Sequence, residues 1–460
     1  MRPSHMLILI LGLATPLQAS PGALTAPATV SRMPSPDELS GLVLNADAVG
    51  HGRVARIRVK IFPHKKGTSP HGEDLDPGTL KLSSKEPCQV FTGQSGSAEP
   101  TQSFVGRKKA AHISARDRSL PLYFKCSSPF TIERGRGRIS HRYAGDLYIQ
   151  RVSDSQGRPE IQAINVLPLE TYLMGVVPAE VYAGWHTETL KSQAVAARTF
   201  ALFHTLYTRQ VMPERAYDVD DSVSYQAYSG LSQLTGRTSE AVMATAGEIL
   251  MHDAKVIQAY YHADSGGTTE DGFEAWGFAV PYCRGQHEEV YREQPATPWQ
   301  VNVNLRELAH SLRDKGLIPP EAMVTRVTID EATHLGRVKS LEVITRTHEA
   351  APQALRLSIG QWRQLTPDPL PSTLFQLVPL GSTTITIVGR GAGHGIGLNQ
   401  TGAELLATKR SLLYRQILAY YYSETNLCTL NPLALASDPT PSCLRKSSLE
   451  KNSFPVLAMP

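Results

Sequence analysis

One acidic residue, Glu180, lies in a short apolar stretch, Val176–Val181, just ahead of a strongly helical segment. The pattern predicts a short helix over Leu167–Met174 and an extended turn at Glu180. A carboxyl group among Val, Pro and Ala side chains loses hydration, which raises its pKa and keeps it protonated closer to neutral pH. A general acid needs this property to protonate the oxygen of a glycosidic bond. The alternatives are a solvated loop glutamate or an acid that caps the helix near Trp185.

A second candidate is His394, which lies in Gly389–Gln400, where every second residue up to Gly397 is a glycine. Such a density of glycine permits positive φ angles and close approach of the backbone to a ligand. A dinucleotide-binding loop does not explain these glycines, because alternating glycines never give the GxGxxG spacing and no βαβ unit follows. A helix beginning near Gln400 could bind an anion with its amides, and the alternative is a plain flexible turn.

Three further residues could take part in chemistry or in packing. Arg198 lies in a helical run of small apolar residues and could hold a sugar ring or form a buried ion pair. Glu170 is a second acid near Glu180 and could be a structural partner. His262 lies beside Ser265-Gly266-Gly267, but the G-x-S-x-G elbow of a serine hydrolase is missing. The chain has no CxxC or HExxH spacing that would indicate a metal site.

Four stretches together resemble the stage II sporulation protein D (SpoIID) family. Gly175–Glu180 matches its GVVP-x-E motif, and Gly391–Ala403 matches G-x-G-H-G-x-G-x-x-Q-x-G-A. Asp220–Gly230 ends in Q-x-Y-x-G, and His262–Glu270 matches H-x-x-S-G-G-x-T-E. The resemblance extends from about residue 166 to residue 427.

The resemblance implies a lytic transglycosylase that cleaves the glycan strands of peptidoglycan, with Glu180 and His394 as catalytic residues. A non-catalytic enhancer of a cell-wall amidase, as found in the same family, is the alternative. Some members bind zinc through Cys and His, but no cysteine lies in Tyr260–Glu270, so we expect no cofactor. The implied substrate-binding residues, each with a packing or loop-stabilising role as the alternative, are Arg198, Gln226, Tyr228, His262, Trp276 and Gln400.

The element pattern predicts an α+β fold, in which a β-rich domain at 45–155 precedes a SpoIID-like catalytic region at 156–428. Arg53–Phe62 alternates apolar and basic residues like a half-buried strand. Asp146–Gln162 is typical of a hairpin, with its turn at Gly157. A long amphipathic helix begins near His186 and ends before Pro213.

The ends of the chain and its composition indicate an exported protein. Residues 1–20 resemble a signal peptide, 21–44 a flexible leader, and 429–460 a Pro- and Ser-rich tail. We therefore expect a periplasmic or extracellular location, with no stable membrane span. The net charge of +4 comes without a basic stripe, which argues against nucleic acid as a partner. By proximity, Cys88–Cys126 and Cys428–Cys443 are plausible disulfides, and one of the five cysteines is left over.

Overall fold

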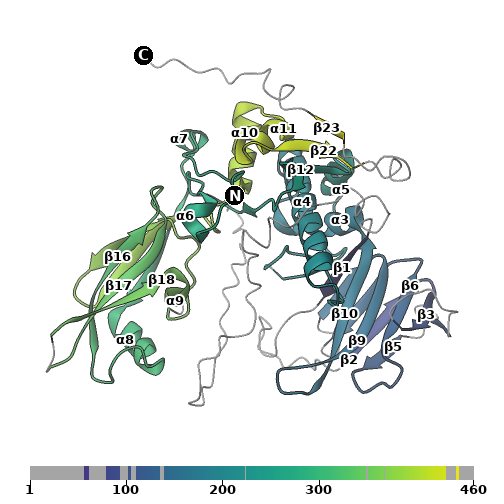
Figure 1. Cartoon of the computed structure of the whole chain (residues 1–460), viewed down its shortest axis with the longest axis horizontal. Helices are drawn as coiled ribbons and strands as arrows, with labels where there is room; N and C mark the ends of the chain where they lie inside the picture. Colours follow the sequence, from purple (N-terminus) through teal and green to yellow (C-terminus); the bar gives the residue numbers. More distant parts are fainter. Residues whose placement is uncertain are drawn as a thin grey trace, which may run out of the picture. The chain divides into compact units, whose positions relative to one another are not determined.

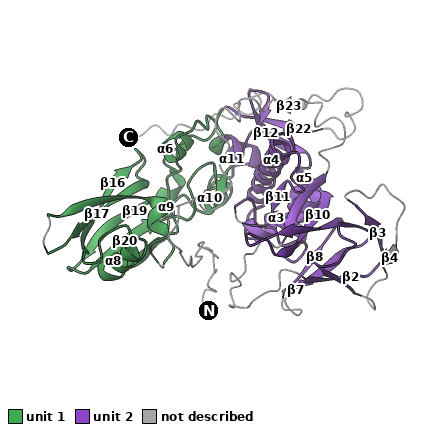
Figure 2. Ribbon diagram, turned by 60° about the horizontal axis from the view of Figure 1, so that its bottom comes forward, with its two compact units in different colours: residues 1–30, 260–411, 420–423 green, residues 31–259, 412–419, 424–460 purple. Residues whose placement is uncertain are grey.

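The structure is a computed structural model in which the chain divides into two compact units (Figures 1 and 2). Among the described residues, unit 1 comprises 260–411 and 420–423, and unit 2 comprises all the others. The expected signal peptide, the leader and most of the expected tail lie outside the described residues. The structure describes residues 56–61, 79–93, 102–104, 110–134, 139–222, 224–348, 351–366, 368–430 and 442–444.

Unit 2 is built on a seven-stranded sheet, in which β1 pairs with β10 and β10 with β9. In β1 every second side chain is buried, as the alternating pattern predicted. The hairpin of β9 and β10 turns at Gly157, where φ is +76°. The strands in sheet order are β11 (Val219–Asp220), β1 (Arg56–Ile61), β10 (Pro159–Pro168), β9 (Asp146–Ser153), β6 (Leu122–Cys126), β3 (Cys88–Thr92) and β4 (Gln102–Phe104).

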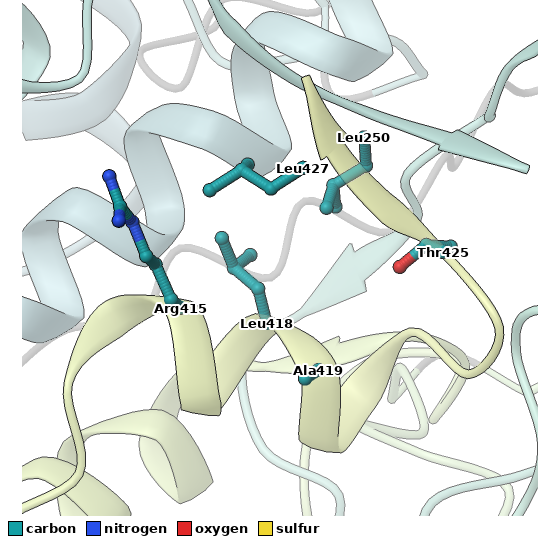
Figure 3. Close-up of a pocket in the computed structure, with 6 residues that line it drawn as sticks. All are labelled: Leu250, Arg415, Leu418, Ala419, Thr425 and Leu427. Atoms are coloured by element: carbon teal, nitrogen blue, oxygen red, sulfur yellow. The ribbon is translucent and has the colours of Figure 1, made fainter. Parts of the chain in front are cut away.

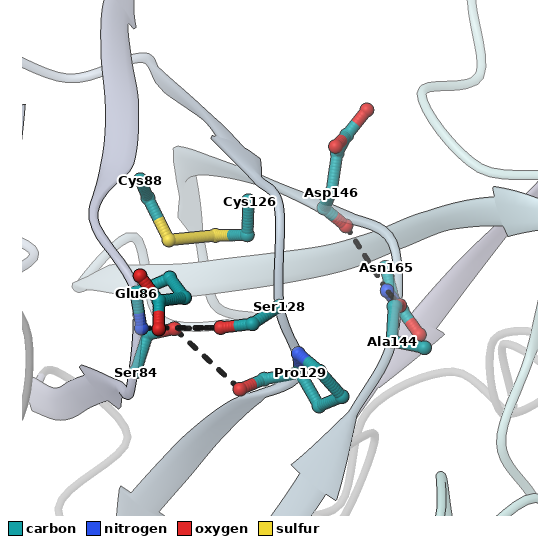
Figure 4. The surroundings of a disulfide bond; sticks show 9 residues. All are labelled: Ser84, Glu86, Cys88, Cys126, Ser128, Pro129, Ala144, Asp146 and Asn165. Carbon is teal, nitrogen blue, oxygen red and sulfur yellow. Dashed lines mark hydrogen bonds between the residues drawn. A yellow bond between two sulfur atoms is a disulfide. The ribbon is translucent and has the colours of Figure 1, made fainter.

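A disulfide joins two neighbouring strands of this sheet, because Cys88 in β3 lies directly opposite Cys126 in β6 (Figure 4). Close to it, the Ser128 hydroxyl accepts a hydrogen bond from the amide of Glu86. Cys428 is also disulfide-bonded, and the strand register places Cys443 opposite it. A four-stranded sheet completes the N-terminal part, in the order β5 (Ala111–Ser114), β2 (Thr79–Ser84), β7 (Phe130–Arg134) and β8 (Ile139–Tyr143).

The helical part of unit 2 is centred on α4 (Thr187–Val211), whose N-cap is His186, as the sequence predicted. This helix contacts α3 (Leu169–Glu180), α5 (Gly236–Ala244) and β12. Apolar side chains of α4 and of strands β12 and β13 form a common core that also includes Cys428. The third sheet has the order β13 (Lys255–Val256), β12 (Glu248–His252), β22 (Asn426–Thr429) and β23 (Ser442–Leu444).

The centre of this helical part contains a fully buried arginine, Arg198. Its guanidinium forms two bonds with the Glu170 carboxylate, Nε to Oε1 at 2.8 Å and Nη2 to Oε2 at 2.7 Å. It also donates to the carbonyl oxygens of Val242 (3.0 Å) and Glu248 (3.2 Å). These bonds connect α4 with α3, with the end of α5 and with the start of β12. The buried ion pair, one of the two alternatives for Arg198, is the arrangement that this structure contains.

Unit 1 has a lobe of two three-stranded sheets, with a continuous core that includes the fully buried Trp362. A short parallel pair, β14 and β21, lies outside this lobe and carries His262 opposite Asn399. The strands are β15 (Pro298–Asn304), β20 (Thr384–Arg390) and β19 (Phe375–Leu380); β16 (Met323–Ala332), β17 (Val338–Arg346) and β18 (Gln353–Ser358); and β14 (Tyr261–His262) and β21 (Leu398–Asn399). The helices are α6 (Gly272–Trp276), α7 (Val290–Glu293), α8 (Leu305–Asp314), α9 (Ile359–Arg363) and α10 (Gln400–Arg410), and α11 (Tyr414–Tyr421) has residues in both units.

The predicted α+β class with a β-rich N-terminal part is confirmed. The N-terminal sheet includes β10, which lies beyond residue 155, the expected end of the β-rich domain. The two compact units divide after residue 259, a position that the sequence pattern did not mark. Strand β23 lies in the stretch expected to be an aperiodic tail. In the part of the chain that the structure describes, helices that could span a bilayer are absent.

Replacing Glu170 by Gln should destabilise unit 2, because Arg198 would keep a buried charge without its counterion. A fully buried pair broken in this way costs roughly 3–5 kcal/mol, and we expect about 2 kcal/mol here because the Glu170 side chain is 27% exposed. Urea unfolding measures this loss. Glu133→Gln, which breaks a surface pair with Lys81, is the control and should cost about 0.5 kcal/mol. Equal losses in both variants would contradict a central role for Arg198.

Candidate active site

Glu180 is the last residue of α3, and the chain leaves the helix immediately after it. The sequence predicted a short helix ending near Met174 and an extended turn at Glu180, which is wrong. The helix continues through Pro178, and it is closed by the amide of Val181, which bonds to the Val177 carbonyl at 3.0 Å. Pro178 has no N–H to bond to the carbonyl four residues earlier, and the helix ends two residues after it, at Glu180.

The Glu180 carboxylate is partly buried, and its orientation is fixed from the following loop. Its Oε1 accepts a hydrogen bond of 2.7 Å from the amide of Ala227. Burial, and further the charge of Glu180, raise the pKa of Tyr172 well above its ordinary value, so this phenol stays neutral. Glu180 therefore combines a fixed orientation with limited access to water.

Gln226 and Tyr228, on the two sides of Ala227, are buried. The Gln226 side chain donates to the carbonyl of Ala197 (3.1 Å) and accepts from the Tyr172 hydroxyl (3.2 Å). The Tyr228 hydroxyl donates to Asn165 at 2.8 Å. In this structure both side chains hold the segment that positions Glu180, which is the loop-stabilising alternative from the sequence.

An exposed aromatic residue that the sequence analysis missed lies two positions after Glu180. The side chain of Tyr182 is 64% exposed, and its ring lies so close to Gly184 that a side chain at that position would clash. Arg237 of α5 fixes the loop by donating to the carbonyls of Gly184 (3.1 Å) and Trp185 (2.7 Å). The available signal was an aromatic residue only two positions after the candidate acid.

In unit 1 the glycine-rich loop packs closely against Tyr260–Gly266 and against Arg337. Gly393 and Gly395 both have positive φ, at +103° and +84°. A side chain at Gly393 would overlap His262, and one at Gly395 would overlap the Arg337 guanidinium. Glycine is therefore required here for close packing within the protein, whether or not a ligand binds.

His394 and His262 lie together in this loop region, with ring centroids 5.4 Å apart. The Nδ1 of His394 accepts from the amide of Ile396 at 3.0 Å. The Nδ1 of His262 lies 3.1 Å from the Ile396 carbonyl, to which it donates. Burial first, and Arg337 second, lower the pKa of His394 to about 4. Burial first, and then the charges of His394 and Arg337, lower the pKa of His262 well below its ordinary value. Both imidazoles are therefore neutral near pH 7.

Trp276 and Gln400 occupy different environments in unit 1. Trp276, at the end of α6, is partly buried, and its ring lies 4.7 Å from Tyr260 and 5.5 Å from His394 by centroid. It therefore extends the aromatic surroundings of His394. Gln400 is 5% exposed and is the first residue of α10.

A buried carboxylate that the sequence analysis did not single out, Glu288, organises the base of this loop. It is 3% exposed and accepts bonds from Ser265, Tyr421 and Asn399. Burial raises its pKa, and these three donors partly offset the shift. Ser265 and Asn399 lie within the two motif segments. Glu288 lies between these segments, where no local sequence pattern marks it as part of the site.

The predicted site residues therefore form two groups. Glu180, Arg198, Gln226 and Tyr228 lie in unit 2, and His262, Trp276, His394 and Gln400 lie in unit 1. His262 and His394 could offer two imidazoles to a zinc ion, but no group of three or more His, Cys, Asp or Glu that could hold a metal occurs among the described residues. We therefore derive no catalytic step through a zinc ion.

A small hollow beside α11 is unsuited to a sugar. It measures about 10 Å³, which is close to the room that a single water molecule needs (Figure 3). It is lined by Leu250, Arg415, Leu418, Ala419, Thr425 and Leu427.

The low pKa of His394 makes the stability of unit 1 depend on pH. Below pH 6.5 the unfolded chain binds a proton at this residue, whereas the folded chain binds one only near pH 4. The unfolding free energy should therefore fall as the pH falls from 6.5 to 4, with at most about 3 kcal/mol from His394. Urea unfolding of wild type and His394→Asn across this range measures the difference. An equally steep pH dependence in both proteins would contradict the assignment.

Comparison with known proteins adds independent information on the chain. The family described as "Stage II sporulation protein" (SpoIID) matches residues 157–252, which include Glu180. An uncharacterised protein of Brachyspira hyodysenteriae is 30% identical over 276 residues, which cover 60% of this chain and 71% of that protein.

Two relatives from Bacillus subtilis have descriptive names. Stage II sporulation protein D is 28% identical over 277 residues, which cover 58% of this chain and 76% of that protein. The amidase enhancer is 28% identical over 298 residues, which cover 55% of this chain but 40% of that protein. Together with the motifs around Glu180 and His394, these matches show that the chain belongs to the SpoIID family.

Proposed function

We propose that this protein is a lytic transglycosylase that cleaves the bond between MurNAc and GlcNAc in peptidoglycan glycan strands. The observation that carries the proposal is the Glu180 carboxyl group, which lies at the end of α3, partly buried and held at 2.7 Å by the Ala227 amide. This is the glutamate of the GVVP-x-E motif, and it lies within the segment that matches the family.

The reaction needs only one acid/base residue. Protonated Glu180 gives its proton to the glycosidic oxygen while the bond from MurNAc C1 to that oxygen breaks. The Glu180 carboxylate then takes the proton of the MurNAc 6-hydroxyl, whose oxygen forms the new bond to C1. The products are a 1,6-anhydroMurNAc end and a GlcNAc hydroxyl, and no water is consumed. Glycoside hydrolases, in contrast, use two carboxylates.

Substrate contacts in this proposal begin with Tyr182. Its exposed ring, two residues from Glu180, offers a flat apolar face on which a sugar ring can stack. Arg198, Gln226 and Tyr228 act as positioning residues, because their side chains are buried and bonded within unit 2. His394, His262, Trp276 and Gln400 remain candidates for substrate contact or catalysis, with two neutral imidazoles available as hydrogen-bonding groups.

An extracytoplasmic location and preference for strands without stem peptides are parts of the same proposal. The Cys88–Cys126 disulfide supports export, since such bonds persist in oxidising compartments. A cell-wall amidase is the possible protein partner.

The alternative is a non-catalytic enhancer of a cell-wall amidase, which the name of one relative favours. An enhancer would bind glycan and raise amidase activity with or without an acid at position 180. A lytic transglycosylase would release anhydro products without any partner.

Glu180→Gln should reduce cleavage of denuded glycan strands by roughly 100-fold or more, because general acid–base catalysis is lost. The amide oxygen of Gln can still accept from Ala227, so the fold should be retained. Mass spectrometry of soluble products should detect 1,6-anhydro ends with wild type and with the control Glu160→Gln, a surface change in β10. Reducing ends would indicate hydrolysis instead. Absence of products from wild type, with amidase stimulation intact in Glu180→Gln, would establish the enhancer.

Tyr182→Ala should weaken glycan binding by about tenfold through loss of ring stacking, whereas Tyr182→Phe should retain most of it. Sedimentation with insoluble denuded glycan, in the Glu180→Gln background, measures binding without cleavage. Met243→Ala removes another exposed apolar side chain of unit 2 and is the matched control. Equal binding by the Ala and Phe variants would exclude stacking on Tyr182.

A further inference from the structure

A second concave site lies on unit 2, and arginines dominate its walls. The cavity measures about 390 Å³ and is lined by Arg56, Arg58, Val166, Arg209 and Pro213. The sequence explains the clustering. Every second residue of β1 points to the partly exposed face, so Arg56 and Arg58 share that face, and α4 brings Arg209 from its last turn.

Among the described residues, the ion pairs around this cavity hold more positive than negative groups. Asp218 is fully buried, and this single carboxylate pairs with two guanidiniums, Arg58 at 2.6 Å and Arg209 at 2.9 Å. Asp146, which is 7% exposed, pairs with Arg56 at 2.7 Å. Three cationic side chains thus face two carboxylates, and neither carboxylate lines the cavity. The open side of the cavity therefore carries an excess of positive charge.

The three guanidiniums are held in place before any ligand arrives. Arg209 Nη2 donates to the carbonyl of Arg56 at 2.7 Å, and Arg56 Nη2 donates to that of Val166 at 2.7 Å. Arg58 and Asp218 are fixed by two further bonds: the Arg58 amide donates to the Asp218 side chain (Oδ2, 2.9 Å), and the Asp218 amide donates to the Arg58 carbonyl (2.8 Å). Because the guanidiniums are already ordered, binding a ligand costs less side-chain conformational entropy.

One donor in this group has no acceptor. Arg56 Nε is buried and makes no hydrogen bond within the part of the chain that the structure describes. This atom has no accessible surface of its own, but the side chains of Arg56, Arg58 and Arg209 are 42%, 28% and 27% exposed, so all three present surface to a ligand. The planar N–H fork of arginine matches the paired oxygens of phosphate and carboxylate groups.

We propose that this cavity is an anion-binding site, and that it takes a phosphate group, free or carried by an extended polymer. The three guanidiniums concentrate positive charge at one cavity wall, and a phosphate offers them more oxygens and more negative charge than a carboxylate, which has two oxygens and a single charge. The proposal does not depend on Glu180 or on glycan cleavage. It gives unit 2 a second contact for an anionic polymer, separate from the candidate acid.

The test is titration calorimetry of the full chain with inorganic phosphate at low ionic strength, with acetate as the second ligand. We expect saturable binding of phosphate at one site, about tenfold tighter than acetate. Arg56→Gln should weaken phosphate binding by about tenfold, since Tyr123 still donates to the Asp146 left behind. Pro213→Asp places a negative charge at the cavity wall beside these arginines and should abolish binding.

Two controls separate this site from general surface charge and from the proposed cleavage activity. Arg158→Gln removes an exposed arginine paired with Asp154 in the β9–β10 turn and should leave phosphate binding unchanged. Glu180→Gln should bind phosphate like wild type whether or not the protein cleaves glycan. Titration with a phosphodiester polymer would then show whether a polymer-borne phosphate is preferred to the free ion. No saturable phosphate binding, equal binding of acetate, or an equal loss in Arg158→Gln would overturn the proposal.

Discussion

The buried ion pair of Arg198 and Glu170 is the interaction on which the surroundings of Glu180 depend. A charge without exposed surface persists only when its donors are satisfied, and Arg198 achieves this with groups from three other elements. Glu170 lies in the first turn of α3 and Glu180 in its last. The Arg198–Glu170 ion pair that fixes the start of this helix therefore also fixes the position of its end. The position of the candidate acid, Glu180, thus depends on an ion pair at the opposite end of α3.

Unit 1 also contains a buried guanidinium, Arg337, but its Nε and Nη1 are buried without a hydrogen-bond partner among the described residues. Arg337 is 2% exposed and donates to the carbonyls of Ser265 and Thr268 at 2.8 and 2.9 Å, while Gly395 packs on its plane. Burial first, and the charge of Arg337 second, lower the pKa of His394. The carbonyls that Arg337 binds lie in the motif segment His262–Glu270, whereas those that Arg198 binds lie in α5 and at the start of β12.

Local rules predicted the elements whose determinants are local. His186 and the apolar stripe after it defined α4, and Gly157 defined the β9–β10 turn. The same rules failed at Pro178, because the helix end tolerates a proline that local propensity treats as a break. They also could not show that Gln226 and Tyr228 are buried, or that Glu288 accepts from both motif segments. Burial and choice of partner are set by residues far away in the sequence, and a sequence pattern does not contain that information.

The pairing of β12 with β22 affects how the protein is made. Ile249 lies opposite Cys428, and the chain between them forms most of unit 1. During synthesis β12 therefore emerges long before the strand that covers its edge, and an uncovered edge offers unpaired backbone groups to other chains. Pairing over such a separation is also intrinsically slow. Although most of unit 2 is translated first, it reaches its complete fold only after unit 1 has left the ribosome.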